Sequence, residues 1–399
     1  MEIATRLLPQ GKILQEWWQE VKGNFWQDDA KPEVLRLVKE LMESTLKEDL
    51  MLHIDRHPYQ RMGDTATYRN GYYNRSLVTQ FGTVSGIKVP RLREGIFSTK
   101  VFRRYKRYQD IIEDLVEGVF LAGVSTRRVG EAVVKLLGTP VSHGTVSRII
   151  KRLDARVREY RRRTILDEYQ YLILDGITLK VRYNNSYHNR KILVAYGVTL
   201  FGERHLISFI QAPGESANAW ESFVNDLYAR GLAGKNLKLI VIDGSKGLRA
   251  ALRLVYPLIP IQRCWAHKGR NVANLLPRKI QKECTAGLKS IYDAKERQGA
   301  LLAFKEWKKK WQNKYPKAVH CVENDLEELL AVYAIPLQHR KKIRTTNVIE
   351  RTFREVRRRT RVFSCFSNKE SCDRIIYAIF AYMNDRWKDH PIKQFTQFC

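Results

Sequence analysis

Two aspartates follow apolar, β-branched stretches of the chain, and each is followed by glycine. Asp175 ends the run LILD before Gly176, and Asp243 ends VID before Gly244. An apolar strand that finishes in this way lifts a carboxylate onto the C-terminal edge of a sheet, where open α/β sheets bind ligands. Two such carboxylates could share hard divalent cations, which support phosphodiester chemistry. Asp-Gly after a strand is also ordinary turn chemistry, so a turn explains either aspartate taken alone.

A third carboxylate, Glu350, stands inside IRTTNVIERTFREVRRRTR, the most basic stretch of the chain. On a helix, Arg351, Arg354 and Arg358 form one basic ridge at i, i+3 and i+7, with Glu350 beside it. An acid that binds a metal ion while flanking arginines hold phosphates would be placed in this way. The alternative is a solvated basic helix in which Glu350 is the i, i+4 ion-pair partner of Arg354.

The segment IQRCWAHKGRN brings together an aromatic ring, an imidazole and three cations. His267 could position a phosphate or a metal-bound water, and Trp265 could stack on an unpaired base. A buried Trp-Cys pair beside a satisfied core histidine explains the same residues. Cys264 and His267 have the CxxH spacing of half a zinc site, but no second pair has suitable spacing. We expect free thiols in a reducing compartment.

The elements that must position these residues are predicted from residue 166 onward. Three apolar runs, YLILDGITLKV, KILVAYGVTL and HLISFIQA, indicate consecutive strands, followed by a helix, the strand LKLIVIDG and a second helix. This order resembles the start of a ribonuclease H-like α/β fold, with its first part over residues 166–267. Residues 268–343 have helical patterns and no convincing strand, which predicts an all-helical insertion. Residues 344–399 return to the α/β domain with C-terminal helices, at about 347–359 and 371–387.

The region before residue 166 is predicted to be mainly helical. Residues 1–60 form an N-terminal helical region, in which PEVLRLVKELM places apolar side chains on one helix face. Residues 61–109 contain a β-hairpin, with strands SLVTQF and VSGIKVPRLR separated by Gly82-Thr83.

Residues 110–165 have the pattern of a helix-turn-helix. In GTPVSHGTVSRIIKRLD a helix starts at Ser142, buries its apolar residues as far as Leu153, and directs Arg148, Lys151 and Arg152 outward. A basic second helix of this kind enters a major groove. Two amphipathic helices joined by a short turn also occur in any helical domain, so the pattern alone leaves DNA binding open.

The charge balance favours a polyanionic partner. The chain has 71 Lys+Arg against 42 Asp+Glu, a formal charge of +29, and nucleic acid is the first candidate. A ribosome-associated or merely very soluble basic protein is the alternative. No stretch approaches the ~20 apolar residues of a spanning helix, and MEIATRLLPQGK lacks the apolar core of a signal peptide. We therefore expect a cytoplasmic protein without a membrane partner.

Three segments in this order are similar to the signature of Mutator-type bacterial insertion-sequence transposases. They are LILDGITLKVR, VIDGSKGLRAALRLVYPLIPIQRCWAHKGRNV and TTNVIERTFREVRRRTRVFSCF. The similarity extends upstream to YRNGYYNRSL, AGVSTRRVGEAV and TVSRIIKRLD, and so covers roughly residues 65–387. The first 60 or so residues carry no matching motif.

The resemblance implies a DDE transposase whose ribonuclease H-like domain is interrupted by the helical insertion. Its three acids correspond to Asp175, Asp243 and Glu350, as catalytic and metal-binding residues for two Mg²⁺ (or Mn²⁺) ions. Water would be the nucleophile for cleavage and a 3′-hydroxyl the nucleophile for strand transfer. The CxxH element of the family matches Cys264 and His267, which implies a place beside the active site.

The partners implied are double-stranded DNA, as terminal inverted repeats and target DNA, and a second copy of the chain in the bacterial cytosol or nucleoid. The N-terminal helices, the hairpin region and the helix-turn-helix would hold the element ends. Two rival classes remain. A non-enzymatic DNA-binding regulator would bind without metal-dependent nicking, and a ribonuclease H-like nuclease or Holliday-junction resolvase would cut without joining.

Overall fold

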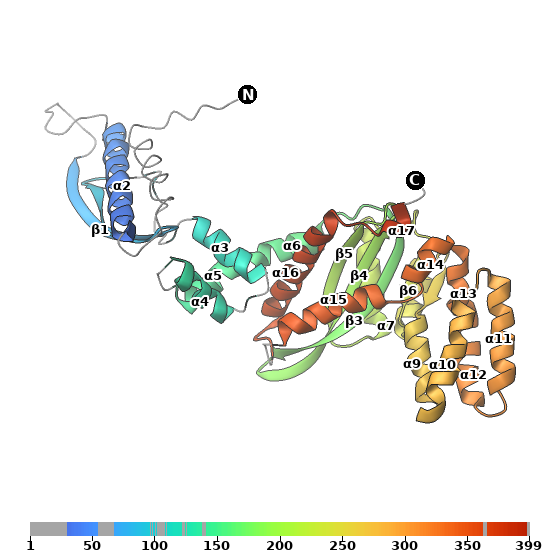
Figure 1. Cartoon of the computed structure of the whole chain (residues 1–399). Coiled ribbons are helices and arrows are strands. Elements are labelled where there is room, and N and C mark those ends of the chain that lie inside the picture. The colour runs from blue at the N-terminus through green and yellow to red at the C-terminus, as the bar shows by residue number, and fades with distance from the viewer. Residues whose placement is uncertain are drawn as a thin grey trace. The chain divides into compact units, whose positions relative to one another are not determined.

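The computed structural model describes residues 30–54, 68–95, 97, 99, 101, 108, 110–121, 124, 126–137, 141–361 and 365–396. The chain divides into two compact units, one of residues 1–120 and 124–151, the other of residues 121–123 and 152–399. Figure 1 labels the helices and strands of both units, and each is described here by itself.

In the first unit, helix α2 (Ala30–Ile54) packs on a hairpin of β1 (Arg69–Thr79) and β2 (Gly82–Leu92). The predicted helix face is confirmed, because its core consists of Val34, Val38, Met42 and Leu46 from α2 and Leu77, Val84, Ile87 and Val89 from the strands.

The hairpin is confirmed, but its turn lies two residues earlier than predicted. Gly82 pairs with Thr79 and Thr83 with Val78, so the turn is at residues 80–81 and not at Gly82-Thr83. The Thr79 hydroxyl decides the position: it donates to the Gly82 carbonyl at 2.9 Å and accepts from the Phe81 N–H at 3.2 Å.

The rest of the first unit contains helices α3 (Asp110–Leu121), α4 (Thr126–Leu137) and α5 (His143–Ile150). Helices α4 and α5 pack together as the predicted pair. Ser142 caps α5, since its side chain accepts from the Thr145 N–H at 3.2 Å. The predicted second helix is wrong in length, because α5 ends at Ile150 and α6 (Leu153–Arg162) begins after a two-residue turn.

The second unit is built on a five-stranded mixed sheet with strand order β5-β4-β3-β6-β7. The three predicted consecutive strands are confirmed as an antiparallel meander, to which β6 and β7 add in parallel. The strands are β3 (Tyr169–Tyr183), β4 (Ser186–Thr199), β5 (Arg204–Ala212), β6 (Leu239–Ile242) and β7 (Ile261–Arg263).

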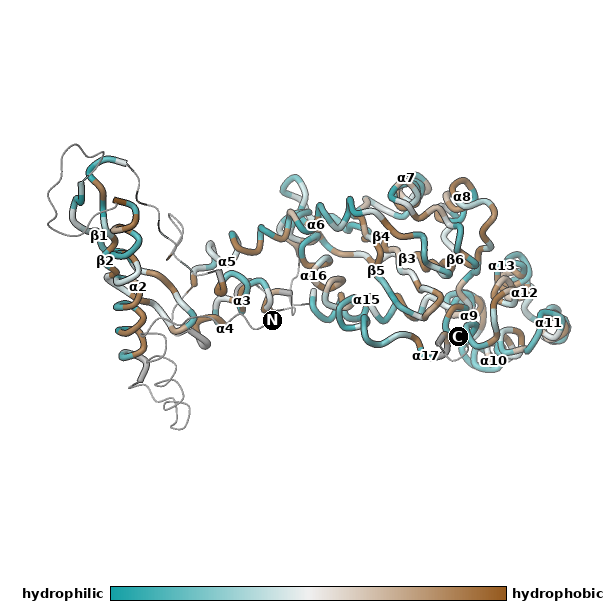
Figure 2. Tube along the Cα trace, turned by 90° about the horizontal axis from the view of Figure 1, so that it is seen from above, coloured by the Kyte–Doolittle hydropathy of each residue, from teal (hydrophilic) through white to brown (hydrophobic). Residues whose placement is uncertain are grey.

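Helices cover both faces of this sheet, as Figures 1 and 2 show. One face carries α7 (Ala217–Ala229) and α8 (Lys246–Val255), and the other carries α15 (Asn347–Thr360), α16 (Lys369–Lys388) and α17 (Lys393–Thr396). Helix α6 packs against α16 and β5. Strands buried on both faces are continuously apolar rather than alternating, which explains runs such as LIVI in β6. The core on the α7/α8 face includes Leu172, Leu174, Ile240, Ile242, Trp220, Phe223 and Leu248.

Between β7 and α15 the chain is helical, and this fully described stretch contains no strand, as expected. Its elements are α9 (Trp265–Asn274), α10 (Arg278–Tyr292), α11 (Arg297–Trp311), α12 (Pro316–Glu323), α13 (Leu326–Leu330), the 3₁₀ turn η1 (Ala331–Ala334) and α14 (Leu337–Ile343). Asp325 joins this stretch to the sheet edge, because it pairs with Lys268 and with Arg263 at 2.6 Å. In the described part of the chain no helix is long and apolar enough to cross a membrane.

Candidate active site

Asp175 lies inside a strand, not at the end of one. Strand β3 continues to Tyr183, and Asp175 and Gly176 pair with Val194 and Leu193 of β4. The expected strand end is therefore wrong, and a turn at this Asp-Gly is excluded. The parallel pairing of β3 with β6 stops at Leu174, so Asp175 is nevertheless the first residue beyond the parallel ladder.

The face on which Asp175 lies follows from the alternation of side chains along a strand. Leu172 and Leu174 belong to the core on the α7/α8 face, so Asp175 is directed to the opposite face, which α15 covers. Asp175 is buried, with 8% of its surface exposed. Its Oδ1 accepts the Gly176 N–H at 2.7 Å.

Asp243 directly follows β6 and is placed by a turn. Gly244 has φ +105°, and a Cβ there would come within 2.3 Å of Arg263 Nε, so this position requires glycine. The Ser245 N–H donates to Asp243 Oδ1 at 2.8 Å. Because Leu174 and Ile242 are paired, Asp175 and Asp243 follow neighbouring residues of adjacent strands.

Glu350 lies in the first turn of α15 and is held from the neighbouring helix α9. Arg270 Nη2 donates to Glu350 Oε1 at 2.7 Å, and His267 Nε2 lies 3.5 Å from the same oxygen. Among the described residues these are its ion-pair partners, so the alternative pairing with Arg354 is wrong. The Glu350 side chain is 30% exposed, which leaves its carboxylate partly accessible.

Electrostatic interactions link Asp175 to the other acidic groups. The pKa of Asp175 is raised to about 7, chiefly by burial and in smaller part by the charges of Asp243 and Glu350, against the opposing effects of the Gly176 N–H and His267. A carboxyl with a pKa perturbed by burial and by specific charged partners marks a candidate functional site. Asp175 and Asp243 thus follow adjacent strands, and α15, which carries Glu350, packs against β3.

Cys264 joins the strand that leads to Asp243 to the helix that carries Glu350. Its N–H donates to the Ile242 carbonyl at 2.8 Å. Its Sγ accepts from the N–H of Thr346 at 3.3 Å and from the Thr346 hydroxyl at 3.4 Å. Thr346 precedes α15 and its carbonyl accepts the Glu350 N–H at 3.0 Å, so Cys264 helps to set the start of that helix.

The thiol and the imidazole of the CxxH pair influence each other. Burial acts to raise the pKa of Cys264, but hydrogen bonds from His267 and Thr346 outweigh it and lower the pKa. The pKa of His267 is raised, chiefly by its contact with Cys264. His267 Nδ1 lies 3.3 Å from the Thr346 hydroxyl, so the ring bridges Thr346 and Glu350.

Trp265 is a core residue, and the interpretation that it stacks on an unpaired base is wrong. Its ring is buried, packs on Tyr292 with a centroid separation of 5.3 Å, and donates its indole N–H to the Leu329 carbonyl at 2.9 Å. Cys264 is buried as well, as the alternative of a buried Trp-Cys pair predicts. His267 is not the satisfied core histidine of that alternative, because its imidazole contacts Glu350.

The donor chemistry of the site suits a hard divalent cation. Each aspartate uses one oxygen to accept a backbone N–H, and the second oxygen accepts no hydrogen bond from the described residues. Carboxylate oxygens are the ligands that Mg²⁺ prefers, and a cation beside Asp175 would lower its pKa. Within the described ranges, however, no group of three or more His, Cys, Asp or Glu side chains is close enough to enclose an ion.

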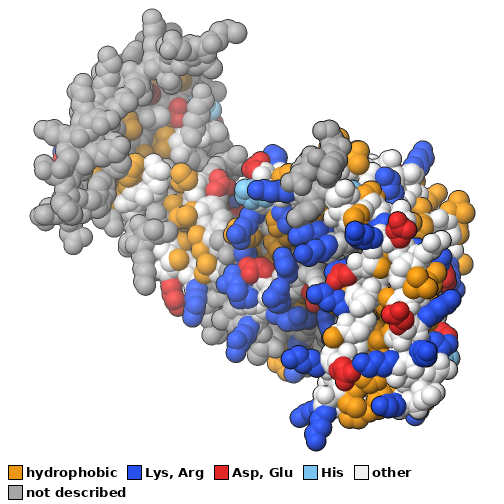
Figure 3. All heavy atoms as spheres, turned by 45° about the vertical axis from the view of Figure 1, so that its right-hand side comes forward, with side chains coloured by type: hydrophobic (Ala, Val, Ile, Leu, Met, Phe, Trp, Pro, Cys, Tyr) orange, Lys and Arg blue, Asp and Glu red, His pale blue; other side chains and the backbone are white. Residues whose placement is uncertain are grey.

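The predicted DNA-contacting side chains are all exposed. Arg148, Lys151 and Arg152 lie at the end of α5 and in the following turn, and Arg351, Arg354 and Arg358 lie along α15. Arg358 is also bound to Glu355 of its own helix, at 2.7 and 2.8 Å. On the face drawn in Figure 3, Lys and Arg side chains outnumber acidic ones.

Two residues that position Glu350 were not singled out from the sequence. Arg270 lies three residues after His267 on α9, and that spacing places both on one helix face, which could have identified it. Thr346 carried no comparable signal, because its contacts with Cys264 and His267 bridge about 80 residues of chain.

Comparisons with known proteins identify the family of the chain. The model of the family "Transposase, Mutator family" matches residues 15–390. The transposase for insertion sequence element ISRM5 of Rhizobium meliloti is 35% identical over 90% of this chain and 89% of its own length. The transposase for IS256 in transposon Tn4001 of Staphylococcus aureus is 33% identical over 90% and 91%. The transposase for IS1081 of Mycobacterium tuberculosis is 32% identical over 82% and 79%. The chain therefore belongs to the Mutator family of transposases, enzymes that catalyse the transposition of insertion sequences.

Proposed function

We propose that this transposase cuts and joins DNA at a site formed by Asp175, Asp243 and Glu350. The observation that carries the proposal is geometric: Asp175 and Asp243 follow paired residues of adjacent strands, and Asp175 is directed to the face that α15, the helix of Glu350, covers. Two Mg²⁺ (or Mn²⁺) ions held by these carboxylates would stabilise the attacking and leaving oxygens and activate water or a 3′-hydroxyl.

The side chains around the acids divide the remaining tasks. Asp175 and Asp243 present oxygens that the adjacent backbone fixes in orientation. Arg270 and His267 hold Glu350 in the first turn of α15. The exposed arginines further along α15, Arg351 and Arg354, are suited to phosphate oxygens.

The fold supports the assignment to the ribonuclease H-like class. An antiparallel meander is followed by two parallel strands, with helices on both faces and a helical stretch between β7 and α15. We propose residues 166–267 and 344–399 as the two parts of the catalytic domain and residues 268–343 as the insertion.

We propose that the first unit binds the terminal inverted repeats. The helix pair α4 and α5 has the size and pairing of a helix-turn-helix, with Arg148 exposed at the end of the second helix and Lys151 in the turn that follows; Arg152, also exposed, is the first residue of the second unit after that turn. Replacing Arg148 and Lys151 by alanine should lower the slope of log Kd against log salt by about 2. An unchanged slope would move the DNA-binding surface elsewhere. Because two ends must be processed together, a dimer is part of the proposal.

One assay tests the proposal against its rivals. The protein is incubated with Mg²⁺ and labelled duplexes that carry the ends of the element, and the products are resolved by size. Joined products support transposition, cleavage alone supports a nuclease or resolvase, and binding alone supports a regulator. Alanine at Asp175, Asp243 or Glu350 should reduce cleavage and joining at least about 10³-fold while DNA binding persists. Glu327→Ala, at an exposed acid of α13, is the control. Near-normal cleavage by Glu350→Ala would overturn the assignment of the third acid.

A further inference from the structure

Strands β3 and β4 continue beyond the five-stranded sheet as a two-stranded ribbon. Pairing of β3 with β6 stops at Leu174, and pairing of β4 with β5 stops at Lys191. Beyond these residues β3 and β4 pair with each other as far as Tyr183 and Ser186. We call residues 179–190 the β3–β4 ribbon.

The β3–β4 ribbon is held rigidly at its tip and along one edge. Asn184 and Asn185 have φ +45° and +61°, as a two-residue type I′ hairpin turn requires. Phe366, just before α16, exchanges two backbone hydrogen bonds with β3: its N–H donates to the Lys180 carbonyl and its carbonyl accepts the Arg182 N–H, both at 2.9 Å. The ribbon and the start of α16 therefore form one rigid surface.

The charge of the β3–β4 ribbon is uncompensated. The sequence has no acidic residue between Asp175 and Glu203. Lys180, Arg182 and Arg190 form no ion pair with any residue that the structure describes. A rigid edge with unpaired cations favours an anionic partner.

Two exposed tyrosines accompany these cations. Arg190 lies over the ring of Tyr183, with 4.9 Å between Cζ and the ring centroid, and Lys180 lies over the ring of Tyr187 at 5.8 Å. The two rings are 50% and 62% exposed. Tyr, Asn and Ser side chains together with Arg and Lys are the types that donate to phosphate and sugar oxygens of nucleic acids.

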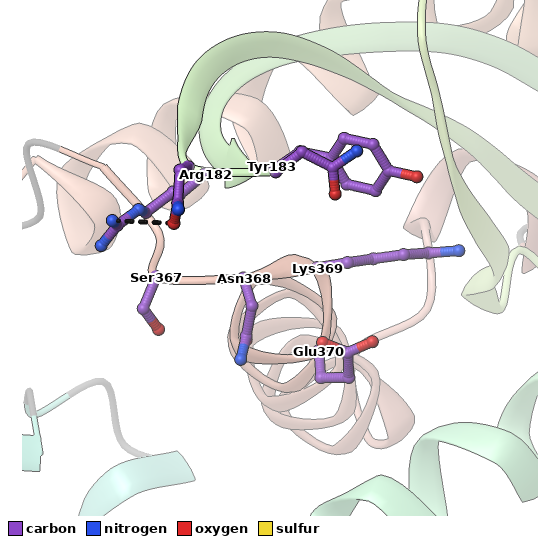
Figure 4. A pocket seen from close by; sticks show the side chains of 8 residues that line it. Arg182, Tyr183, Ser367, Asn368, Lys369 and Glu370 are labelled. Atoms are coloured by element: carbon purple, nitrogen blue, oxygen red, sulfur yellow. Dashed lines mark hydrogen bonds between the residues drawn. The ribbon is translucent and has the colours of Figure 1, made fainter.

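A hollow of about 680 Å³ lies between residues 182–185 of the ribbon and residues 367–370 at the start of α16. Figure 4 shows Arg182 and Tyr183 on the ribbon side and Asn368, Lys369 and Glu370 on the other. In that view the Lys369 side chain lies between Tyr183 and the Glu370 carboxylate. Glu370 is the acid of the hollow, so its lining has two cations against one anion.

The unpaired cations favour a nucleic acid, and the distance to the candidate active site sets where along it the ribbon would bind. Strand β3 runs without interruption from Asp175 to Arg182, and seven residues of strand span about 23 Å. Duplex DNA rises about 3.4 Å per base pair, so this length corresponds to about seven base pairs. We propose that the β3–β4 ribbon and the start of α16 bind the sugar-phosphate backbone of duplex DNA about seven base pairs from the phosphate that is cut. This inference rests on the proposed function.

The test measures how the unsubstituted protein and a variant of the ribbon bind duplexes of different lengths. Labelled element-end duplexes extend about 4 or about 14 base pairs from the cut position, on each side in turn. With the long duplexes, Lys180→Ala/Arg182→Ala should weaken binding about 10-fold and lower the salt slope by about 2. On one side, shortening to about 4 base pairs should abolish the difference from the unsubstituted protein, because the contacted phosphates are then missing.

Two further variants keep the test specific. Lys309→Ala/Lys314→Ala removes two exposed cations of the helical stretch, the same change in charge as in the ribbon variant. Its effect on DNA binding should not depend on duplex length. Glu370→Gln removes the acid of the hollow and should tighten binding to long duplexes about twofold, because one repulsive charge is lost. Melting curves check that each variant folds.

The outcomes separate this inference from the proposed function. If the ribbon variant binds all duplexes like the unsubstituted protein, or is weakened equally on short ones, the inference is wrong. A change in self-association without a change in DNA binding would identify a protein interface and would also overturn it. Absence of cleavage by the unsubstituted protein would instead contradict the proposed function, while the binding measurements would still decide the role of the ribbon.

Discussion

The aspartates and the glutamate of the candidate site are positioned by different means. Asp175 and Asp243 are set by backbone structure, one within a paired strand and one in a glycine turn after the neighbouring strand. Glu350 lies on a helix whose start is held by side chains, through Cys264, Thr346 and His267. The two halves of the site should therefore respond differently to substitution. Backbone changes should damage the aspartate half, whereas side-chain truncations should loosen the glutamate half.

The largest effect is expected at Gly244. Gly244→Ala places a Cβ 2.3 Å from Arg263 Nε on a backbone with φ +105°, so the turn that carries Asp243 must shift. We expect a loss of strand cleavage of about 100-fold or more, since sub-ångström placement controls this kind of chemistry. The measurement is the rate of cleavage of a labelled element end at saturating protein.

The control for this substitution is Gly234→Ala, at a glycine with φ +85° whose added Cβ would meet the Tyr256 ring. It introduces similar backbone strain in the same unit, away from the carboxylates, and should lower the melting temperature with little effect on cleavage. Equal losses of cleavage in both variants would mean that general destabilisation, not displacement of Asp243, is responsible.

A smaller effect is expected for Cys264→Ala, which removes the sulfur that accepts from Thr346 while leaving the β6 backbone contact in place. The start of α15 should become less well fixed, with cleavage slowed about 10-fold and DNA affinity unchanged. Cys264→Ser keeps an acceptor and should recover part of the rate.

Cys284→Ala provides the matched control, because Cys284 is another buried cysteine whose described contacts lie within the helical stretch. If it slows cleavage as much as Cys264→Ala does, the effect comes from loss of core volume and the bridging role of Cys264 is wrong. A weakened response to Mg²⁺ in the Cys264 variant alone would support the bridge.

The smallest effect concerns stability and pH in the aspartate half. Burial and the neighbouring acids raise the pKa of folded Asp175 to about 7, above the ~3.9 of an unfolded aspartate. The folded state then holds its proton more tightly, so stability is lost as pH rises between these values and stays low above pH 7. Asp175→Asn stays neutral and should be stabilising without divalent metal, by on the order of 2 kcal/mol more at pH 8 than at pH 5.

Melting temperatures at the two pH values, with chelator and then with Mg²⁺, measure this difference. Mg²⁺ should stabilise the unsubstituted protein more than Asp175→Asn, because the cation favours the ionised carboxyl. If Asp175→Asn raises the melting temperature equally at both pH values, ionisation of Asp175 does not destabilise the folded protein. The contrast between the two halves of the site would then rest on geometry alone.

The strands and helices of the second unit could be predicted because their signals are local. Apolar runs located β3, β4, β5 and β6, and helical periodicity located α15 and α16 to within a few residues. The second helix of the predicted pair was made too long, since α5 ends at Ile150, and two other local predictions failed for identifiable reasons. The hairpin turn was misplaced because Thr79, not Gly82, closes it, and β3 was ended too early because Asp-Gly also fits within a paired strand.

The family was also accessible from sequence, since the order of the three segments resembles the family pattern and the family match spans residues 15–390; the three acids stay a prediction. The contacts that surround these acids could not be predicted from the sequence. The pairing of Glu350 with Arg270 instead of Arg354, the burial of Trp265 and the link from Cys264 to Thr346 each join segments about 60 to 80 residues apart.

Residue types and their spacing were therefore enough to establish the strongly basic charge, most of the elements and Asp175 and Asp243 as candidates, because each of these depends on a short stretch of chain, whereas Glu350 was selected by the family resemblance. Only the folded arrangement decided which cation holds Glu350, which side of β3 Asp175 lies on, and that burial beside Asp243 and Glu350 raises its pKa. These properties depend on distances between segments and on exclusion of water, and neither quantity exists until the sheet and α15 have packed together.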